Sequence, residues 1–80
     1  MLSYNAFLAD LAIGYENHLQ TTVPNRQQRY GQYLYNMLRV ARPDVANLLR
    51  GTPYDPFHKD VITSEAHAQI EKVWNAWSRT

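Results

Sequence analysis

The sequence predicts an all-α protein: a small compact bundle of three main helices plus one short helix. Four segments place apolar residues three or four positions apart, which is the spacing of one face of an α-helix. Breaks fall between those segments at Pro24, Pro43 and Gly51. No segment alternates apolar and polar residues as a half-buried strand would, so we expect no β-sheet.

The length and composition of the chain fit a single helical domain over residues 1–80. The 80 residues are 45% apolar and 19% charged, a balance that favours a globular protein over a disordered one. There is no cysteine, so neither a disulfide nor a thiolate metal site can add to the core. A domain this short buries only about 60–65% of its unfolded surface, so we expect a small margin of stability.

The first helix is expected from about Tyr4 to Gln20. Ser3 is a suitable N-cap, because its side chain can accept a hydrogen bond from a free amide of the first turn. Gly14 lies inside the helix and indicates the close approach of a neighbouring helix, whereas Ile13 lies among polar residues on the opposite side. The apolar stripe consists of Tyr4, Phe7, Leu8, Leu11, Ala12, Tyr15 and Leu19.

The second helix is expected from about Arg26 to Ala41, with Asn25 as its cap. Pro24 separates it from the first helix, because proline lacks an amide donor and disfavours helical geometry in the residue before it. Gly31 lies at the edge of the inner face, where it would let two helices pack tightly. The inner face carries Tyr30, Tyr33, Leu34, Met37, Leu38, Val40 and Ala41, and the outer face carries Gln28, Arg29, Gln32, Tyr35, Asn36, Arg39 and Arg42.

The short third helix is expected from Pro43 to Arg50. Proline suits the first helical position, and the charge of Asp44 suits the positive end of the helix dipole. Gly51 should end the helix, because glycine readily adopts the left-handed conformation that often follows one. Its small apolar side consists of Val45, Leu48 and Leu49.

A loop is expected over residues 52–62, which show no helical or strand period. Asp55 followed by proline predicts one helical turn from Asp55 to Asp60. Tyr54 and Phe57 are expected to hold the loop against the core.

The last helix is expected to start at Thr63 or Ser64 and to run to about Ser78. A glutamate in its first turn suits the positive end of the helix dipole. Its apolar stripe consists of Ala66, Ile70, Val73, Trp74 and Trp77.

We expect no enzyme and no catalytic, cofactor-binding or metal-binding residue. The three histidines, His18, His58 and His67, do not have the spacing of a helix-borne metal site. Asp55, His58 and Asp60 cluster in the loop, but no phosphate-binding loop or serine nucleophile accompanies them. A bundle of this size should also leave little room for a ligand cavity of about 300 Å³ or more.

The arginines predict a binding surface. Residues 26–50 hold five arginines and one acid, a net charge of +4, whereas residues 1–25 carry −2 and residues 51–80 carry −1. Aromatic residues make up 12% of the chain, more than so small a core needs, so Tyr33, Tyr35 and Tyr54 are expected to be partly exposed. Arginine and tyrosine often dominate the energy of protein interfaces. The expected partner-binding residues are Arg29, Gln32, Tyr35, Arg39 and Arg42. The alternative is a solvated face whose charges pair with the acidic ends of the molecule.

A nucleic-acid partner for the same arginines is the alternative function. The overall charge is only +1, and just two lysines are present. A helix-turn-helix reader would need polar residues facing the bases, but the short third helix is mostly apolar. A protein partner is therefore favoured.

One part of the chain resembles a known family. The carrying residues are Arg29-Tyr30-Gly31-Gln32, Leu34, Asn36, Leu38, Arg42-Pro43-Asp44, Leu49-Arg50-Gly51-Thr52 and Asp55-Pro56-Phe57. This pattern is similar to that of small uncharacterised proteins from tailed bacteriophages and prophages. It covers residues 29–57, and this chain differs from it in a longer N-terminal helix and in His58, where an aromatic is more usual. The resemblance implies a phage accessory protein that acts inside a bacterial host.

We therefore expect a small non-enzymatic phage protein that binds a host or viral protein and modulates it by occlusion. A structural or oligomer-forming phage component is a third possibility. No stretch is long and apolar enough to cross a membrane. Residues 1–5 lack the basic start and apolar run of a signal peptide, so we expect a cytoplasmic location in the host cell.

Overall fold

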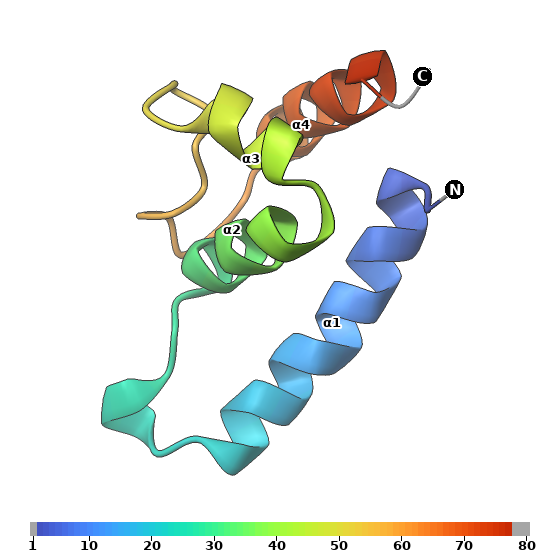
Figure 1. Cartoon of the computed structure of the whole chain (residues 1–80). Helices are drawn as coiled ribbons and strands as arrows, with labels where there is room; N and C mark the ends of the chain where they lie inside the picture. The colour runs from blue at the N-terminus through green and yellow to red at the C-terminus, as the bar shows by residue number, and fades with distance from the viewer. Residues whose placement is uncertain (1, 78–80) are drawn as a thin grey trace.

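The computed structural model describes residues 2–77 and contains four α-helices. They are α1 (Tyr4–Thr21), α2 (Tyr30–Ala41), α3 (Pro43–Leu49) and α4 (Ser64–Trp77), with a short 3-10 helix η1 (Pro24–Arg26) between the first two (Figure 1). No strand occurs within residues 2–77. The predicted all-α bundle of three main helices and one short helix is confirmed.

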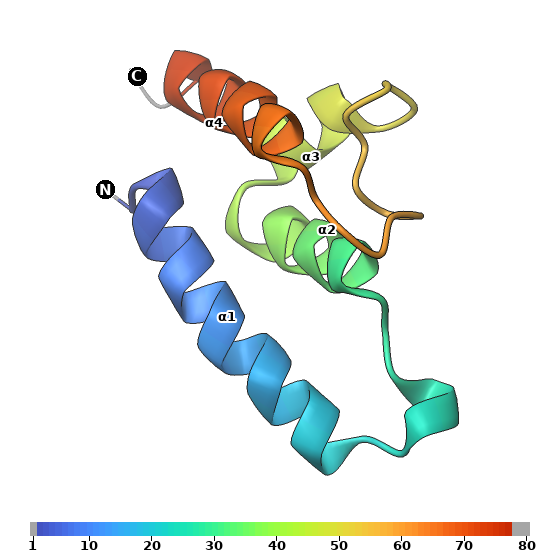
Figure 2. The ribbon, with the colours of Figure 1, turned by 180° about the vertical axis from the view of Figure 1, so that it is seen from behind.

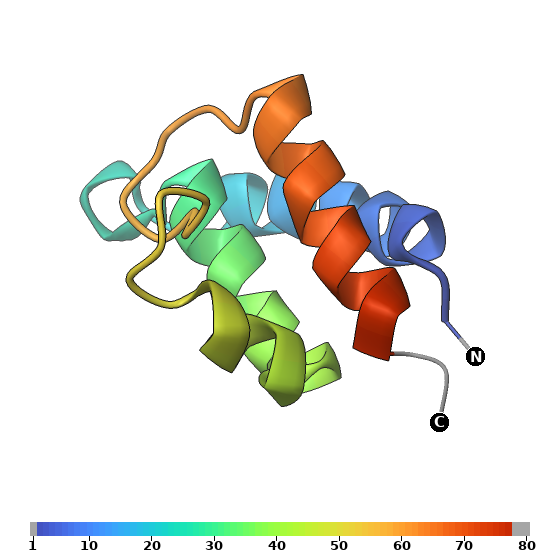
Figure 3. The same ribbon diagram turned by 90° about the horizontal axis from the view of Figure 1, so that it is seen from above.

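The four helices pack around a shared core, with α1 on one side of it. The long helix α1 runs along one side, and α2 packs against its middle (Figures 1 and 2). α3 reverses direction directly after α2 and packs against it, and α4 packs against both α3 and α1 (Figure 3). The start of α1 therefore lies beside the later turns of α4, where the indole N–H of Trp74 donates to the Leu2 carbonyl at 3.2 Å.

The core is built from the predicted apolar stripes. Trp74 is the largest of the fully buried side chains. The tyrosine and phenylalanine rings of α1 pack on it, with centroid distances of 5.7 Å for Tyr4 and 5.2 Å for Phe7. The buried apolar residues are Tyr4, Phe7, Leu11, Leu34, Tyr35, Leu38, Val45, Ala46, Leu49, Ile62, Ala66, Ile70 and Trp74. Helix α1 thus covers α4 with its first turns and α2 with its middle and later turns.

Two local predictions for α1 are confirmed. The Ser3 side chain accepts a hydrogen bond from the Ala6 amide at 3.1 Å and so caps the helix. A Cβ at position 14 would lie 2.7 Å from the Tyr33 hydroxyl oxygen, so Gly14 does mark the close approach of α2. Leu19, by contrast, belongs to the predicted stripe but is exposed.

The predicted start of α2 is wrong. Asn25 lies inside η1, and α2 begins at Tyr30 instead of Arg26. The reason is that α1 hydrogen-bonds the backbone of Gln28, which therefore stays extended. His18 Nε2 accepts from the Gln28 amide at 3.0 Å, and the Tyr15 hydroxyl donates to its carbonyl at 2.9 Å.

The faces of α2 also differ from the prediction. Tyr35 is only 7% exposed, whereas Val40 is 78% exposed and Ala41 is exposed as well. Helix α3 causes this difference, because it folds back on the Tyr35 side of α2, and the Tyr35 hydroxyl donates to the Ala46 carbonyl at 3.3 Å. The expected partial exposure of Tyr35 is therefore wrong, while Tyr33 and Tyr54 are half-buried against the core.

Gly31 packs against the loop rather than against a second helix. Its amide donates to the Lys59 carbonyl at 2.9 Å. A Cβ at this position would overlap the carbonyl oxygens of Pro56 and Lys59. The absence of a side chain at Gly31 therefore lets the loop backbone lie directly on α2.

The loop after α3 is held by side chains. Gly51 ends α3 with a φ of 77°, as predicted. The expected helical turn from Asp55 to Asp60 is absent. The two oxygens of the Asp55 carboxylate accept from the amides of Gly51 and Phe57, each at 3.0 Å, so this aspartate shapes the loop instead of starting a helix.

The start of α4 agrees with the prediction. The Thr63 hydroxyl accepts from the Ala66 amide at 3.1 Å, as an N-cap does. The predicted end at Ser78 and the side chain of Trp77 lie outside the part of the chain that the structure describes.

Candidate partner-binding surface

Two of the five predicted binding residues are arginines that already have acidic partners. Arg29 Nε lies 3.4 Å from an oxygen of Asp60, and both side chains are largely exposed. Arg42 forms two hydrogen bonds to Asp44, at 3.1 and 2.8 Å. Arg29 thus follows the alternative of pairing with an acidic end of the chain, whereas Arg42 pairs with Asp44 of its own basic segment.

Arg42 has a structural position at the corner between α2 and α3. Its side chain is only 17% exposed, and its guanidinium lies 4.9 Å from the centre of the Trp74 ring. The hydrogen bonds from Arg42 hold the pKa of the Asp44 carboxyl below its ordinary value. Arg42 therefore helps to cover the core and is less accessible to a partner than the sequence predicts.

Tyr35 and Gln32 also contribute less than predicted. Tyr35 is buried, and its ring meets that of Phe57 edge-on at 5.7 Å. Gln32 is half-buried and borders neither of the two surface hollows described below. Arg29 and Arg39 are the exposed residues among the five, and of these two only Arg39 borders the hollows, where it lines both.

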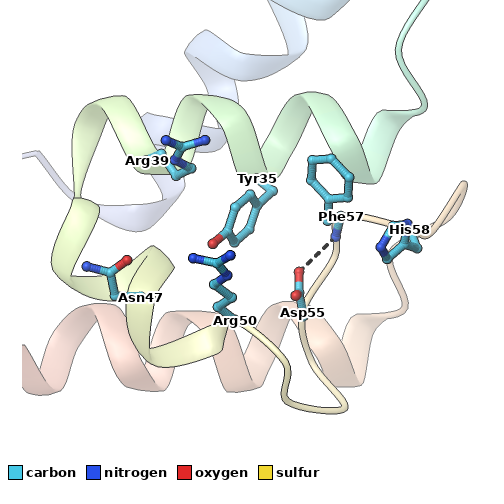
Figure 4. Close-up of a pocket in the computed structure, with 7 residues that line it drawn as sticks. All are labelled: Tyr35, Arg39, Asn47, Arg50, Asp55, Phe57 and His58. Atoms are coloured by element: carbon cyan, nitrogen blue, oxygen red, sulfur yellow. Dashed lines mark hydrogen bonds between the residues drawn. The ribbon is translucent and has the colours of Figure 1, made fainter.

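A hollow of about 460 Å³ lies between α2, α3 and the following loop. We call it the basic hollow, and its lining residues are Tyr35, Arg39, Asn47, Arg50, Asp55, Phe57 and His58 (Figure 4). Arg50 reaches from the end of α3 toward Tyr35, with Arg39 and Asn47 on one side of it and Phe57 on the other (Figure 4). The sequence analysis missed Arg50 and Asn47 because they come from α3, whose direction relative to α2 was unknown.

In the basic hollow, the aspartate has hydrogen-bond partners, whereas the two arginines have no ion pair within the described chain. Arg39 and Arg50 are exposed, and neither forms an ion pair with any residue in the described part of the chain. Asp55 is the acid in the lining, and both of its oxygens accept backbone amides. The hollow therefore offers two free guanidinium groups.

A second hollow of about 520 Å³ adjoins the first. We call it the apolar hollow, and it is lined by Asn36, Met37, Arg39, Val40, Pro43 and Asn47. Arg39 and Asn47 border both hollows, so they form one continuous surface across α2 and α3. Both hollows exceed the volume expected of so small a bundle.

The histidines and acids singled out in the sequence do not converge. His18 holds the turn after α1, and His67 Nδ1 lies 2.9 Å from the Tyr4 hydroxyl. Asp55 is used by backbone amides and Asp60 pairs with Arg29, so they form no acid–base pair with His58. Within residues 2–77, no group of three His, Cys, Asp or Glu side chains could hold a metal ion. None of the described helices is long and apolar enough to cross a membrane.

The chain matches no protein-family model, and neither a curated protein nor a solved structure is significantly similar to it. An inference about function therefore rests on the sequence and the structure of this chain.

Proposed function

We propose that this chain is a small non-enzymatic accessory protein that binds another protein through the surface formed by the basic and apolar hollows. Two exposed arginines without ion pairs, Arg39 and Arg50, beside the half-buried ring of Phe57 are the observation that supports it most. Arginine and aromatic side chains carry much of the energy of protein interfaces. The surface thus keeps the predicted arginine character but moves from one helix to the junction of α2, α3 and the loop.

The mode of action that fits such a protein is occlusion. Most of the lining residues lie on α2 and α3, and α3 follows α2 with the single residue Arg42 between them. Residues that are already ordered in helices lose little backbone entropy on binding, which favours affinity from a small contact area. The resemblance to small phage proteins suggests a host or viral protein as the target and the cytoplasm of a bacterial host as the location.

Capture of the partner tests this proposal. The tagged protein would be incubated with bacterial lysate, with and without nuclease, beside the double variant Arg39→Glu, Arg50→Glu. We expect a stoichiometric protein that survives nuclease and is lost with the double variant. Arg42 is left intact, because a glutamate there would repel Asp44 and lose the contact of the guanidinium with the Trp74 ring.

The matched control is Arg26→Glu, a charge reversal on the exposed η1 far from both hollows. This variant should retain the partner, and circular dichroism should show the same helix content for all three proteins. A double variant that captures the partner as well as the unmodified protein does would refute the proposed surface.

A nucleic-acid partner and a self-assembling phage component are the alternatives. Nucleic acid would be recovered without nuclease, and its binding would fall steeply with salt. Only two free arginines line the basic hollow, together with one carboxylate, which favours a protein. A self-assembling component would show an oligomer by light scattering.

A further inference from the structure

The basic and apolar hollows lie side by side and have two lining residues in common, Arg39 and Asn47. Arg39 borders both, and its neighbour in sequence, Val40, is 78% exposed in the apolar hollow. Pro43 is also exposed there, and Met37 is half-buried. Methionine is a flexible side chain that adapts to different apolar partners. One ligand segment that crosses Arg39 would therefore meet two guanidinium groups on one side and an apolar surface on the other.

The arginines within residues 2–77 divide into paired and unpaired ones, and Arg26 on η1 is also without an ion pair there. Arg29 and Arg42 each have an aspartate within 3.4 Å. Arg39 and Arg50 have no such acid among residues 2–77, although their side chains border the same hollow. A guanidinium group matches a carboxylate in shape and charge and can bind it through two parallel hydrogen bonds. The basic hollow is thus complementary to a carboxylate that comes from outside the chain.

The acid in the lining forms no ion pair with either arginine. Each oxygen of Asp55 accepts a backbone amide at 3.0 Å, so this carboxylate is directed into its own loop. It still repels ligands with a high density of negative charge, such as a nucleic-acid backbone. A single carboxylate near an apolar side chain meets less repulsion and also uses the apolar hollow.

We infer that the basic hollow binds an aspartate or glutamate side chain of the partner protein, and that an apolar residue a few positions away in the same segment occupies the apolar hollow. The ligand is therefore an acidic peptide segment with an apolar anchor. Arg39 and Arg50 hold the carboxylate, the exposed amide of Asn47 is available to the same segment, and Val40 contacts the apolar residue. This assignment rests on the proposed function and specifies the chemistry of its partner.

A random peptide library displayed on yeast tests the inference. The library would be selected for binding to the unmodified protein and, in parallel, to the Arg39→Glu, Arg50→Glu variant. We expect the first selection to enrich peptides with Asp or Glu within a few positions of an apolar residue. The second selection should lose those peptides and enrich Lys or Arg in place of the acid, because the charge of the hollow is reversed.

A selected peptide would then be synthesised with its acid unchanged or replaced by the matching amide. Fluorescence anisotropy should show binding to the unmodified protein that is about tenfold to hundredfold weaker for the amide peptide. The variant Arg39→Gln, Arg50→Gln should bind both peptides equally weakly. This variant removes the charges without introducing repulsion, and circular dichroism distinguishes loss of the carboxylate contact from misfolding.

Several results would overturn the inference. They are a first selection without enrichment of acids, an amide peptide that binds as tightly as the acid, and displacement of the peptide by equimolar inorganic phosphate or duplex DNA. The proposed function fails separately, when the double variant still captures the partner from lysate. If the variant loses the partner but the peptides show no acidic preference, only the carboxylate assignment fails.

Discussion

Two regions of this small bundle differ in whether their polar groups have partners within the described protein. Where α4 crosses the start of α1, the aromatic cluster of Tyr4, Phe7, His67 and Trp74 is packed together, and its polar atoms find partners inside the protein. Where α2, α3 and the loop meet, Arg39 and Arg50 remain exposed without an ion pair in the described chain. The first region is part of the core, and the second is the surface that we propose for binding.

The difference is instructive because both regions use arginine and aromatic residues. Arg42 lies over the Trp74 ring and pairs with Asp44, whereas Arg39 lies one helical turn earlier and has neither contact. Residue type alone therefore does not separate a structural arginine from a binding one. The position of the next helix decides which role each arginine takes.

The largest expected effect concerns Trp74. Trp74→Ala should destabilise the protein by about 3–5 kcal/mol, because a fully buried indole leaves a large cavity. That loss is close to the whole stability expected of a domain this small, about 5 kcal/mol. Denaturant unfolding followed by circular dichroism measures it.

Phe57→Ala is the matched change in the binding region. Its ring is only half-buried, so we expect a loss of no more than about 2 kcal/mol and a folded protein. Equal losses for the two variants would remove the distinction between a stabilising and a binding region.

A smaller difference in the free energy of unfolding is expected between substitutions of Arg42 and Arg39. Arg42→Ala should cost about 1–2 kcal/mol, because it removes a contact with the Trp74 face and the cover that its aliphatic stem provides. Arg39→Ala should change the free energy of unfolding by no more than about 0.5 kcal/mol, since the side chain is exposed. Thermal unfolding of both variants under one buffer condition tests the contrast, and the opposite order would contradict it.

The smallest expected effect is a pH dependence that arises in the aromatic cluster. Burial lowers the pKa of His67 below its ordinary value of 6.5, so the folded protein binds this proton less readily than the unfolded chain does. The stability from neutral His67 is complete above pH 6.5. It declines as the pH falls from 6.5 toward the lowered pKa and then levels off.

Urea unfolding at a series of pH values checks this dependence. His67→Gln should give a shallower decline, because glutamine does not titrate in this range. His58→Gln is the control in the binding region, where the side chain is exposed and forms no hydrogen bond within the described chain. If His67→Gln leaves the decline unchanged, another group is responsible.

Much of the fold could be predicted from the sequence, because its strongest patterns are local. The stripe through Tyr4, Phe7 and Leu11 and the cap at Ser3 depend on residues within a few positions of one another. The start of α2 could not be found in the same way. It depends on His18, which lies ten positions before the Gln28 amide that it binds.

The binding surface could be predicted only in part for the same reason. Helical spacing correctly placed Arg39 on an exposed face. It wrongly placed Tyr35 there, because α3 covers that side of α2. Arg50 joins Arg39 only when α3 turns back across α2, and no periodicity within one helix encodes that turn.

The single residue between α2 and α3 has a consequence for the order of folding. Contacts across this corner join residues close in sequence, so they form at a small loss of chain entropy. The hydrogen bond from Trp74 to the Leu2 carbonyl, by contrast, joins residues 72 positions apart and closes almost the whole chain into one loop. The α2–α3 corner can therefore form early and serve as a template, and the docking of α1 on α4 completes the native state.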